Sequence, residues 1–168
     1  MKKRVVVLLL AGISLFIYSC QKKDILPKEN AVPAQKGQAV IESNRNGAGP
    51  YVLNMVISLS GDEEVPAVNT TAKGLAHLRV GSDKKLYSKV IIQNLEDGDA
   101  LRFAHVHAGA AGINGPVRIF LCHTAEDFGK NIVTDLTDEQ YNLLLNDPTY
   151  VNAHSNFSPG GLVRGQIR

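Results

Sequence analysis

From Leu53 onward the chain alternates apolar and polar residues with a period of two, and this pattern limits its fold more than any other feature. Every second position of the stretch 53–59 is apolar, namely Leu53, Met55, Ile57 and Leu59. Successive side chains of a β-strand point to opposite faces, so this pattern predicts a half-buried strand. Similar segments follow at 74–80, 86–92, 101–108, 117–121, 150–154 and 162–167.

Turn and helix signals complete the prediction of the fold. Asp97-Gly98 lies between two of the strand segments and is a strong hairpin signal. Thr137 and Gln140 have the spacing of a helix capping box, and Pro148 ends the helix that they begin. We therefore expect an all-β fold, an antiparallel Greek-key-like β-sandwich of about seven to eight strands with one short helix.

The first 20 residues have the pattern of an export signal. A basic segment at 2–4 precedes an uncharged, mostly apolar run at 5–18, which is shorter than the roughly 20 residues that span a bilayer. The run leads into Ser19-Cys20, which resembles the lipobox of bacterial lipoproteins, although Ile17 and Tyr18 are unusual in such a box. We expect cleavage before Cys20 and lipid on its sulfur. The alternative is an ordinary signal peptide with a coincidental cysteine.

Composition divides the rest of the chain into a tether and a domain. Residues 20–49 contain few large apolar side chains and hold Pro27 and Pro33, as expected of a flexible linker. Residues 1–49 carry eight Lys and Arg against three Asp and Glu, whereas 50–168 carry ten against thirteen. The mildly acidic domain at 50–168 argues against nucleic acid as a partner. We expect the protein to be in the bacterial cell envelope, anchored by lipid in the outer membrane. The sequence does not determine whether it is on the periplasmic or the surface face.

Several blocks in this domain resemble one known family, the CHRD domain, which is named for chordin and recurs in bacterial secreted proteins. The resemblance covers roughly Val52 to Arg168, and its blocks are 61–68, 105–109, 112–117, 150–154, 159–161 and 164–167. It marks as motif residues Glu64, Pro66, Gly109, Gly112, Asn114, Gly115, Pro116, Asn152, Arg164, Gly165 and Gln166.

The chain departs from the family pattern at two positions. Ala67 stands where the family usually has a second proline, and Leu162 stands where it usually has a glutamate. Any role of that acid is therefore absent here. In animals the family implies binding to growth-factor systems, which does not transfer to a bacterial lipoprotein. For bacterial members the resemblance implies little beyond export.

Two histidines on one predicted strand are the sharpest chemical feature. His105 and His107 are two residues apart, so both imidazoles point to the same face. His154 on another strand would complete a set of three nitrogens for Zn²⁺ or Cu²⁺, and Glu64 would add an oxygen. The alternative is that neutral histidines hydrogen-bond to the backbone of the loop 109–115.

A second resemblance bears on the same strand. The segment 103–109 is similar to the copper-binding strand of copper/zinc superoxide dismutases, which are also Greek-key sandwiches. The similarity covers one strand and supports the general architecture rather than an activity. No serine lies in a nucleophile elbow, so no catalytic residue is predicted. Cys122 is expected to be a small buried hydrophobe.

Two functions remain open at this point. The first is a non-catalytic binding or structural module, tethered to the membrane and displayed to a protein or glycan of the envelope or the extracellular space. The second is a metal-binding protein with redox or hydrolytic activity at the three histidines. The first function involves no catalysis, and we expect that the protein is not an enzyme.

The export pattern makes a prediction about the N-terminus. Mass spectrometry of the native N-terminal peptide should show a diacylglyceryl or triacyl modification on Cys20. The variant Cys20→Ser should leave the membrane fraction, because a lipid chain supplies most of the membrane affinity of such an anchor. An unmodified N-terminus at another residue would contradict the lipoprotein assignment.

Overall fold

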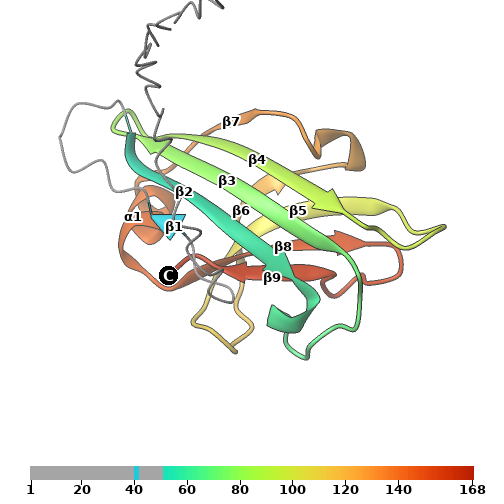
Figure 1. Cartoon of the computed structure of the whole chain (residues 1–168). Helices are drawn as coiled ribbons and strands as arrows, with labels where there is room; N and C mark the ends of the chain where they lie inside the picture. Colours follow the sequence, from blue (N-terminus) through green and yellow to red (C-terminus); the bar gives the residue numbers. More distant parts are fainter. Residues whose placement is uncertain (1–39, 42–50) are drawn as a thin grey trace, which may run out of the picture. The chain divides into compact units, whose positions relative to one another are not determined.

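The computed structural model describes residues 40–41 and 51–168. Figure 1 shows the strands β1 (Val40–Ile41), β2 (Tyr51–Ser60), β3 (Lys73–Gly81), β4 (Lys85–Gln93), β5 (Leu101–Ala108), β6 (Val117–Cys122), β7 (Ile132–Asp135), β8 (Thr149–Ser155) and β9 (Val163–Gln166), with one α-helix, α1 (Asp138–Asn146). Within these ranges no helix is long and apolar enough to cross a membrane. Cys20 and the expected tether, apart from 40–41, lie outside the described residues.

The strands pair antiparallel in one sheet that folds back on itself. Their order is β6-β5-β8-β9-β2-β3-β4-β7, and β1 adds to β2. Figure 1 shows the two halves, β2, β3, β4 and β7 in one layer and β5, β6, β8 and β9 in the other. The pair Ser60 and Arg164 joins β2 to β9, and β4 also contacts β6, so the barrel or sandwich is nearly closed. The expected all-β antiparallel fold with one short helix is confirmed.

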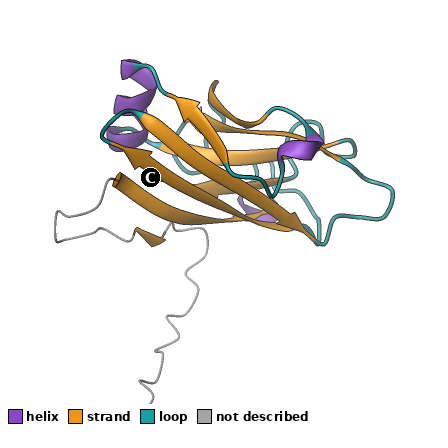
Figure 2. Ribbon diagram, turned by 90° about the horizontal axis from the view of Figure 1, so that it is seen from above, coloured by secondary structure: helices purple, strands orange, loops and turns teal. Residues whose placement is uncertain are grey.

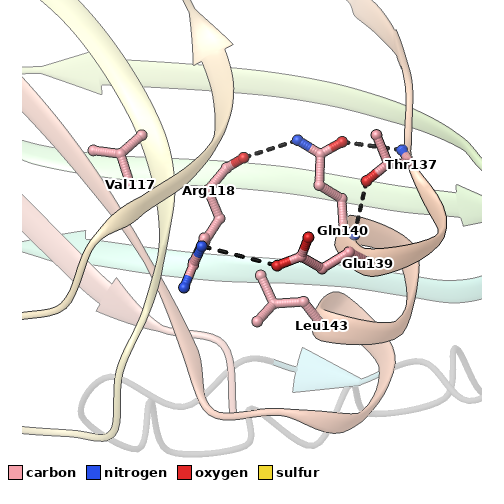
Figure 3. Close-up of a pocket in the computed structure, with 6 residues that line it drawn as sticks. All are labelled: Val117, Arg118, Thr137, Glu139, Gln140 and Leu143. Carbon is pink, nitrogen blue, oxygen red and sulfur yellow. Dashed lines mark hydrogen bonds and ion pairs between the residues drawn. The ribbon is translucent and has the colours of Figure 1, made fainter.

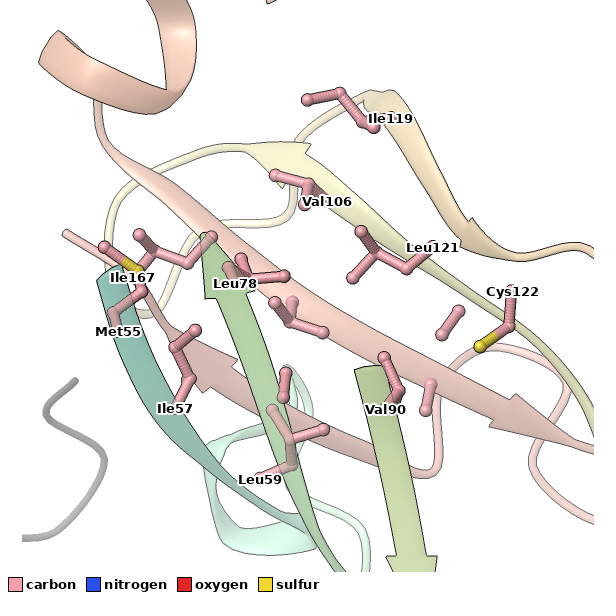
Figure 4. Packing of buried hydrophobic residues seen from close by; sticks show 14 of the residues in the cluster. Met55, Ile57, Leu59, Leu78, Val90, Val106, Ile119, Leu121, Cys122 and Ile167 are labelled. Carbon is pink, nitrogen blue, oxygen red and sulfur yellow. The ribbon is translucent and has the colours of Figure 1, made fainter. Parts of the chain in front are cut away.

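A single apolar core lies between the two layers. The four apolar residues of β2 that alternate with polar ones are at most 6% exposed, as the period-two pattern predicted. Figure 4 shows Ile57, Leu78 and Val106 meeting in this core from both layers. Leu162, at the position where the family usually has a glutamate, is also part of the core, so its side chain contributes apolar burial there.

The helix α1 begins and ends where the sequence predicted. Thr137 Oγ1 accepts from the Gln140 backbone N–H at 3.2 Å, and Gln140 Oε1 accepts from the Thr137 N–H at 3.0 Å. Figure 2 shows α1 beside one end of the strands. Leu144 is buried in the core, and Gln140 also donates to the Arg118 carbonyl of β6 at 2.9 Å. Thr137, Gln140 and Arg118 line the pocket in Figure 3, and the hydrogen bond from Gln140 to Arg118 holds the helix against β6.

Two strands were not predicted from the sequence. The two residues of β1 pair with Val56 and Met55 of β2, so the segment expected to be a free tether adds a short strand to the domain. The four residues of β7 pair with β4 and are alternately half-buried and exposed. Both strands are too short to show a period, which explains why pattern analysis missed them.

The loop 109–116 between β5 and β6 is shaped by glycines for two different reasons. Glycine and asparagine adopt positive φ most readily, so the sequence of this loop predicts positive φ at Gly112, Asn114 and Gly115. Gly112 has φ +76, but the other two do not have positive φ, so that part of the expectation was wrong. Gly115 must be glycine because a Cβ there would overlap the carbonyl oxygen of Ala108.

The loop geometry predicts a ranking of glycine substitutions. Gly115→Val should destabilise the domain by about 3 kcal/mol or more, because the backbone of β5 must move to admit a side chain. Gly112→Ala should cost only about 1 kcal/mol, since its Cβ would meet open space and only the positive φ opposes it. Urea unfolding measures both values. Equal losses in the two variants would contradict the close-approach explanation.

Candidate functional site

The outer face of β5, β8 and β9 carries polar and aromatic residues that are nevertheless buried. Across the strands, His105 lies opposite Asn152, and Asn152 lies opposite Arg164. Directly opposite residues of antiparallel strands share a face, so these side chains form one layer. We call it the polar layer, and its members are His105, His107, Tyr150, Asn152, His154 and Arg164.

The structure brings the three predicted histidines together in this layer. One ring nitrogen from each of His105, His107 and His154 lies within 4.8 Å of the others, and each residue is at most 9% exposed. The closest contact joins His105 Nδ1 and His107 Nε2 at 3.2 Å. The expected convergence of the three rings is therefore confirmed, and the binding of a metal remains a prediction.

Backbone carbonyls orient two of the three rings. His107 Nδ1 lies 2.9 Å from the Gly115 carbonyl oxygen, and His154 Nδ1 lies 2.9 Å from the Pro159 carbonyl oxygen. A carbonyl only accepts, so both Nδ1 atoms carry the proton and both neutral rings have their lone pair on Nε2. His154 Nε2 is buried and has no hydrogen-bond partner in the described structure. Its lone pair is free to bind an electrophile.

Burial keeps the imidazoles neutral. It lowers the pKa of His105 from 6.5 to about 4, with smaller contributions from the neighbouring His154 and His107. Burial also lowers the pKa values of His107 and His154, although the Gly115 and Pro159 carbonyls act in the opposite direction. At pH 7 all three rings are therefore neutral, which is the protonation state that binds metals.

Aromatic rings hold the cluster in place, and sequence analysis did not identify them. Phe103 packs on His105 and His154 with centroids 4.9 and 4.7 Å apart, and Phe120 packs edge-on against His105 at 4.8 Å. Tyr150 stacks on His107 at 4.7 Å. The period-two pattern places Phe103 on the His105 face and Tyr150 on the His154 face, and that signal would have found these two.

Glu64, the predicted oxygen ligand, lies beside Asn152 instead of within the histidine group. Its Oε1 accepts from Asn152 Nδ2 at 2.8 Å, and it is absent from the set of ligand atoms within 4.8 Å. Burial raises the Glu64 pKa from 4.5 to about 7, and the nearby Arg164 charge and the Asn152 hydrogen bond oppose that rise. Asn152 Oδ1 is buried without a partner among the described residues. The structure thus unites three of the four predicted ligands.

Arg164 is fully buried and connects the layer to the loop above it. Its guanidinium donates to the carbonyls of Ala110 and Ile113 at 3.1 and 3.0 Å and to Asn114 Oδ1 at 3.2 Å. It also lies 3.5 Å from the centroid of the Tyr150 ring. These contacts give Arg164 a structural role.

The remaining motif residues support the same loops. Gln166 Nε2 donates to the Gly109 carbonyl at 2.9 Å, and the Pro116 carbonyl accepts from the Ala108 N–H at 3.1 Å. Gly165 is glycine because a Cβ there would overlap the carbonyl of Ser58. The Val65–Pro66 peptide bond is cis. These residues shape the surroundings of the site and do not join the three ring nitrogens.

Cys122 takes no part in the site. It is 1% exposed and belongs to the apolar core, as predicted for a small buried hydrophobe. Burial, with a smaller effect of Asp127, raises the pKa of its thiol to about 12, so the thiol is protonated at neutral pH. His123, the next residue, is exposed.

Comparison with known proteins gives one match. The chain matches the family described as CHRD domain over residues 55–167, which covers most of the chain and nearly all of its folded part. No curated protein and no solved structure matches it. The match confirms the resemblance of the sequence blocks and does not specify an activity.

The lowered pKa of His105 predicts a loss of stability in acid. Between pH 6.5 and about 4 the unfolded chain binds a proton at this residue that the folded, metal-free protein excludes. The free energy of unfolding should therefore fall as the pH falls through this range, by about 3 kcal/mol from His105 alone. Urea unfolding at pH 7, 5.5 and 4 measures the loss. His105→Gln should reduce the slope, whereas His77→Gln, a change at an exposed strand position, should preserve it.

Proposed function

This chain belongs to the CHRD domain family, and we propose that it is a membrane-tethered, extracytoplasmic module that binds one Cu²⁺ or Zn²⁺ ion through His105, His107 and His154. The observation that carries the proposal is the convergence of three buried imidazole nitrogens, one of which has no partner. The N-terminal export pattern supports the extracytoplasmic location.

The spacing of the ring nitrogens is close to what one ion needs. Two nitrogens at about 2.0–2.1 Å from a tetrahedral ion are separated by roughly 3.4 Å. His105 Nδ1 and His107 Nε2 are already 3.2 Å apart. The three atoms lie within 4.8 Å of one another, so closure by at most about 1.4 Å brings them to one ion. Small rotations of the imidazole rings supply this movement.

The surroundings of the ring nitrogens match those of metal ligands. A histidine that binds a metal commonly donates its other N–H to a carbonyl or carboxylate, which fixes the tautomer. His107 and His154 both do so, through Gly115 and Pro159. Before His105 Nδ1 binds, its proton must move to Nε2 by exchange with water, or the ring must turn so that Nε2 takes its place. Loading therefore releases the hydrogen bond between His105 and His107 and replaces it with two metal bonds.

The donor set favours copper over zinc. All three donors are imidazole nitrogens, with no thiolate or carboxylate among the described residues of the group. Such sites bind Cu²⁺ more tightly than Zn²⁺ by the general order of divalent metals. Three protein ligands leave further coordination positions for water or a substrate. Redox or hydrolytic activity would need access to those positions, so we propose binding rather than turnover.

One observation favours a second function. The His105–His107 hydrogen bond satisfies two of the three nitrogens without an ion. On this interpretation the histidines only stabilise the loops, and the domain is a non-catalytic module that binds a protein or glycan partner of the envelope. His154 Nε2, buried and unpartnered, is the atom that this second function leaves unexplained.

Calorimetry on the chelator-treated protein separates the two functions. We expect one Cu²⁺ ion per chain, weaker binding of Zn²⁺, and a copper signal in electron paramagnetic resonance with imidazole nitrogen couplings. His107→Ala should weaken Cu²⁺ binding at least about a hundredfold, because removal of even an outer-shell partner of a ligand costs ten- to a hundredfold.

His77→Ala is the matched control, since His77 is exposed on β3, away from the three rings. It should bind copper as the wild type does. If wild type, His107→Ala and His77→Ala bind copper equally, the cluster is structural and the binding-module function stands.

A further inference from the structure

A second candidate site adjoins the segment 158–161, whose Pro159 carbonyl orients His154. It is a pocket of about 400 Å³, within the size range of small-molecule sites. Its walls come from the 64–68 turn, the tip of the loop 109–116 and the segment 158–161. Its lining includes Glu64, Val65, Pro66, Val68, Asn114 and Gly161.

Hydrogen bonds tie the turn to the loop tip and to the sheet, and a further one closes the segment 158–161 on itself. Asn114 Nδ2 donates to the Val65 carbonyl at 2.7 Å, which links the loop tip to the turn. Glu64 is held by Asn152 of β8. The Gly161 N–H donates to the Ser158 carbonyl at 3.2 Å. The pocket is therefore formed before any ligand arrives, which lowers the entropy cost of binding.

Sequence blocks far apart in the chain meet at this pocket. Glu64, Asn114 and Gly161 follow one another at intervals of about 50 residues and belong to three of the blocks singled out in the sequence. The three-histidine site uses none of these side chains. Gly161 has φ +145, and a Cβ there would come within 2.5 Å of Asn152 Nδ2 and 2.6 Å of Glu64 Oε1, so only a glycine lets the backbone approach this pair so closely.

Charge and polarity define the ligand that this pocket fits. Glu64 is 7% exposed and is the ionisable residue of the lining, and two further acids, Asp62 and Glu63, precede it in the same turn. The nearest cation, Arg164, donates to the loop 110–114 and to Gln166. Val65, Pro66 and Val68 supply apolar contact. A buried carboxyl group gains most from a donor that carries positive charge.

We propose that this pocket binds a small organic cation, whose ammonium or guanidinium group pairs with Glu64 and whose apolar chain lies along Val65, Pro66 and Val68. A free amine and a Lys or Arg side chain of another protein share this chemistry. The site is separate from the three histidines, so its test does not depend on the metal.

The experiment uses the full-length metal-free protein at pH 8, above the Glu64 pKa of about 7 so that the carboxyl group is mainly ionised, and three probes. Nα-acetyl-lysine-N-methylamide represents a side chain of a protein, n-butylamine represents a free amine, and Nα-acetyl-norleucine-N-methylamide is the uncharged match of the first. We expect the lysine derivative or the amine to bind with a dissociation constant on the order of 1 mM or below, and the norleucine derivative at least about tenfold more weakly. The stronger of the two cations identifies the source of the ligand.

Two variants assign the binding to the pocket. Glu64→Gln keeps an oxygen to accept from Asn152 but removes the charge, and it should weaken binding of the cation at least about tenfold. Asp62→Asn removes an exposed acid of the same turn that does not line the pocket, and it should change binding less than about twofold.

Amide chemical shifts of the wild type keep the test decisive if Glu64→Gln fails to fold. Titration with the cation should move the signals of Val65, Val68 and Gly161. The proposal would be overturned if the norleucine probe bound as tightly as the cations, if the two variants had equal effects, or if the shifts were confined to other residues. It would also be overturned if neither cation bound at 10 mM, roughly ten times the expected dissociation constant.

Discussion

The functional face depends on the contacts made by the buried guanidinium group of Arg164. A buried cation is costly unless hydrogen bonds and neighbouring charges satisfy it, and no carboxylate lies within ion-pair distance among the described residues. Arg164 is satisfied instead by two carbonyls and Asn114 of one loop and by the face of Tyr150. The loop is thereby fixed on the sheet, which positions Gly115 beside His107.

Much of this arrangement follows from the period-two pattern. The strand pattern places His105 with His107 and Asn152 with His154 on single faces, and the motif blocks pointed to a shared location. The register of β5 against β8 then sets His105 opposite Asn152. Register depends on contacts across the whole sheet, so the sequence indicated the face of each residue but not its neighbour on the next strand.

The long-range contacts of the loops could not be predicted from the sequence for the same reason. The sequence suggested Glu64 as a metal ligand, yet its partner is Asn152, 88 residues away, and the approach of Gly161 decides that geometry. Gly115 was expected to need positive φ, but the tight approach of the Ala108 carbonyl is what excludes a side chain. A glycine in a sequence shows that space or conformation is restricted, and only the fold distinguishes the two.

The junction between the two layers runs through the pocket beside Glu64 and not through the histidine cluster. β2 and β9 share one residue pair, Ser60 with Arg164, whereas β5, β8 and β9 pair along most of their lengths. All three histidines lie in the latter layer, but Glu64 follows β2 in the other. A small rotation of one layer against the other would therefore reshape the pocket at the seam and carry the histidine cluster along as a rigid unit.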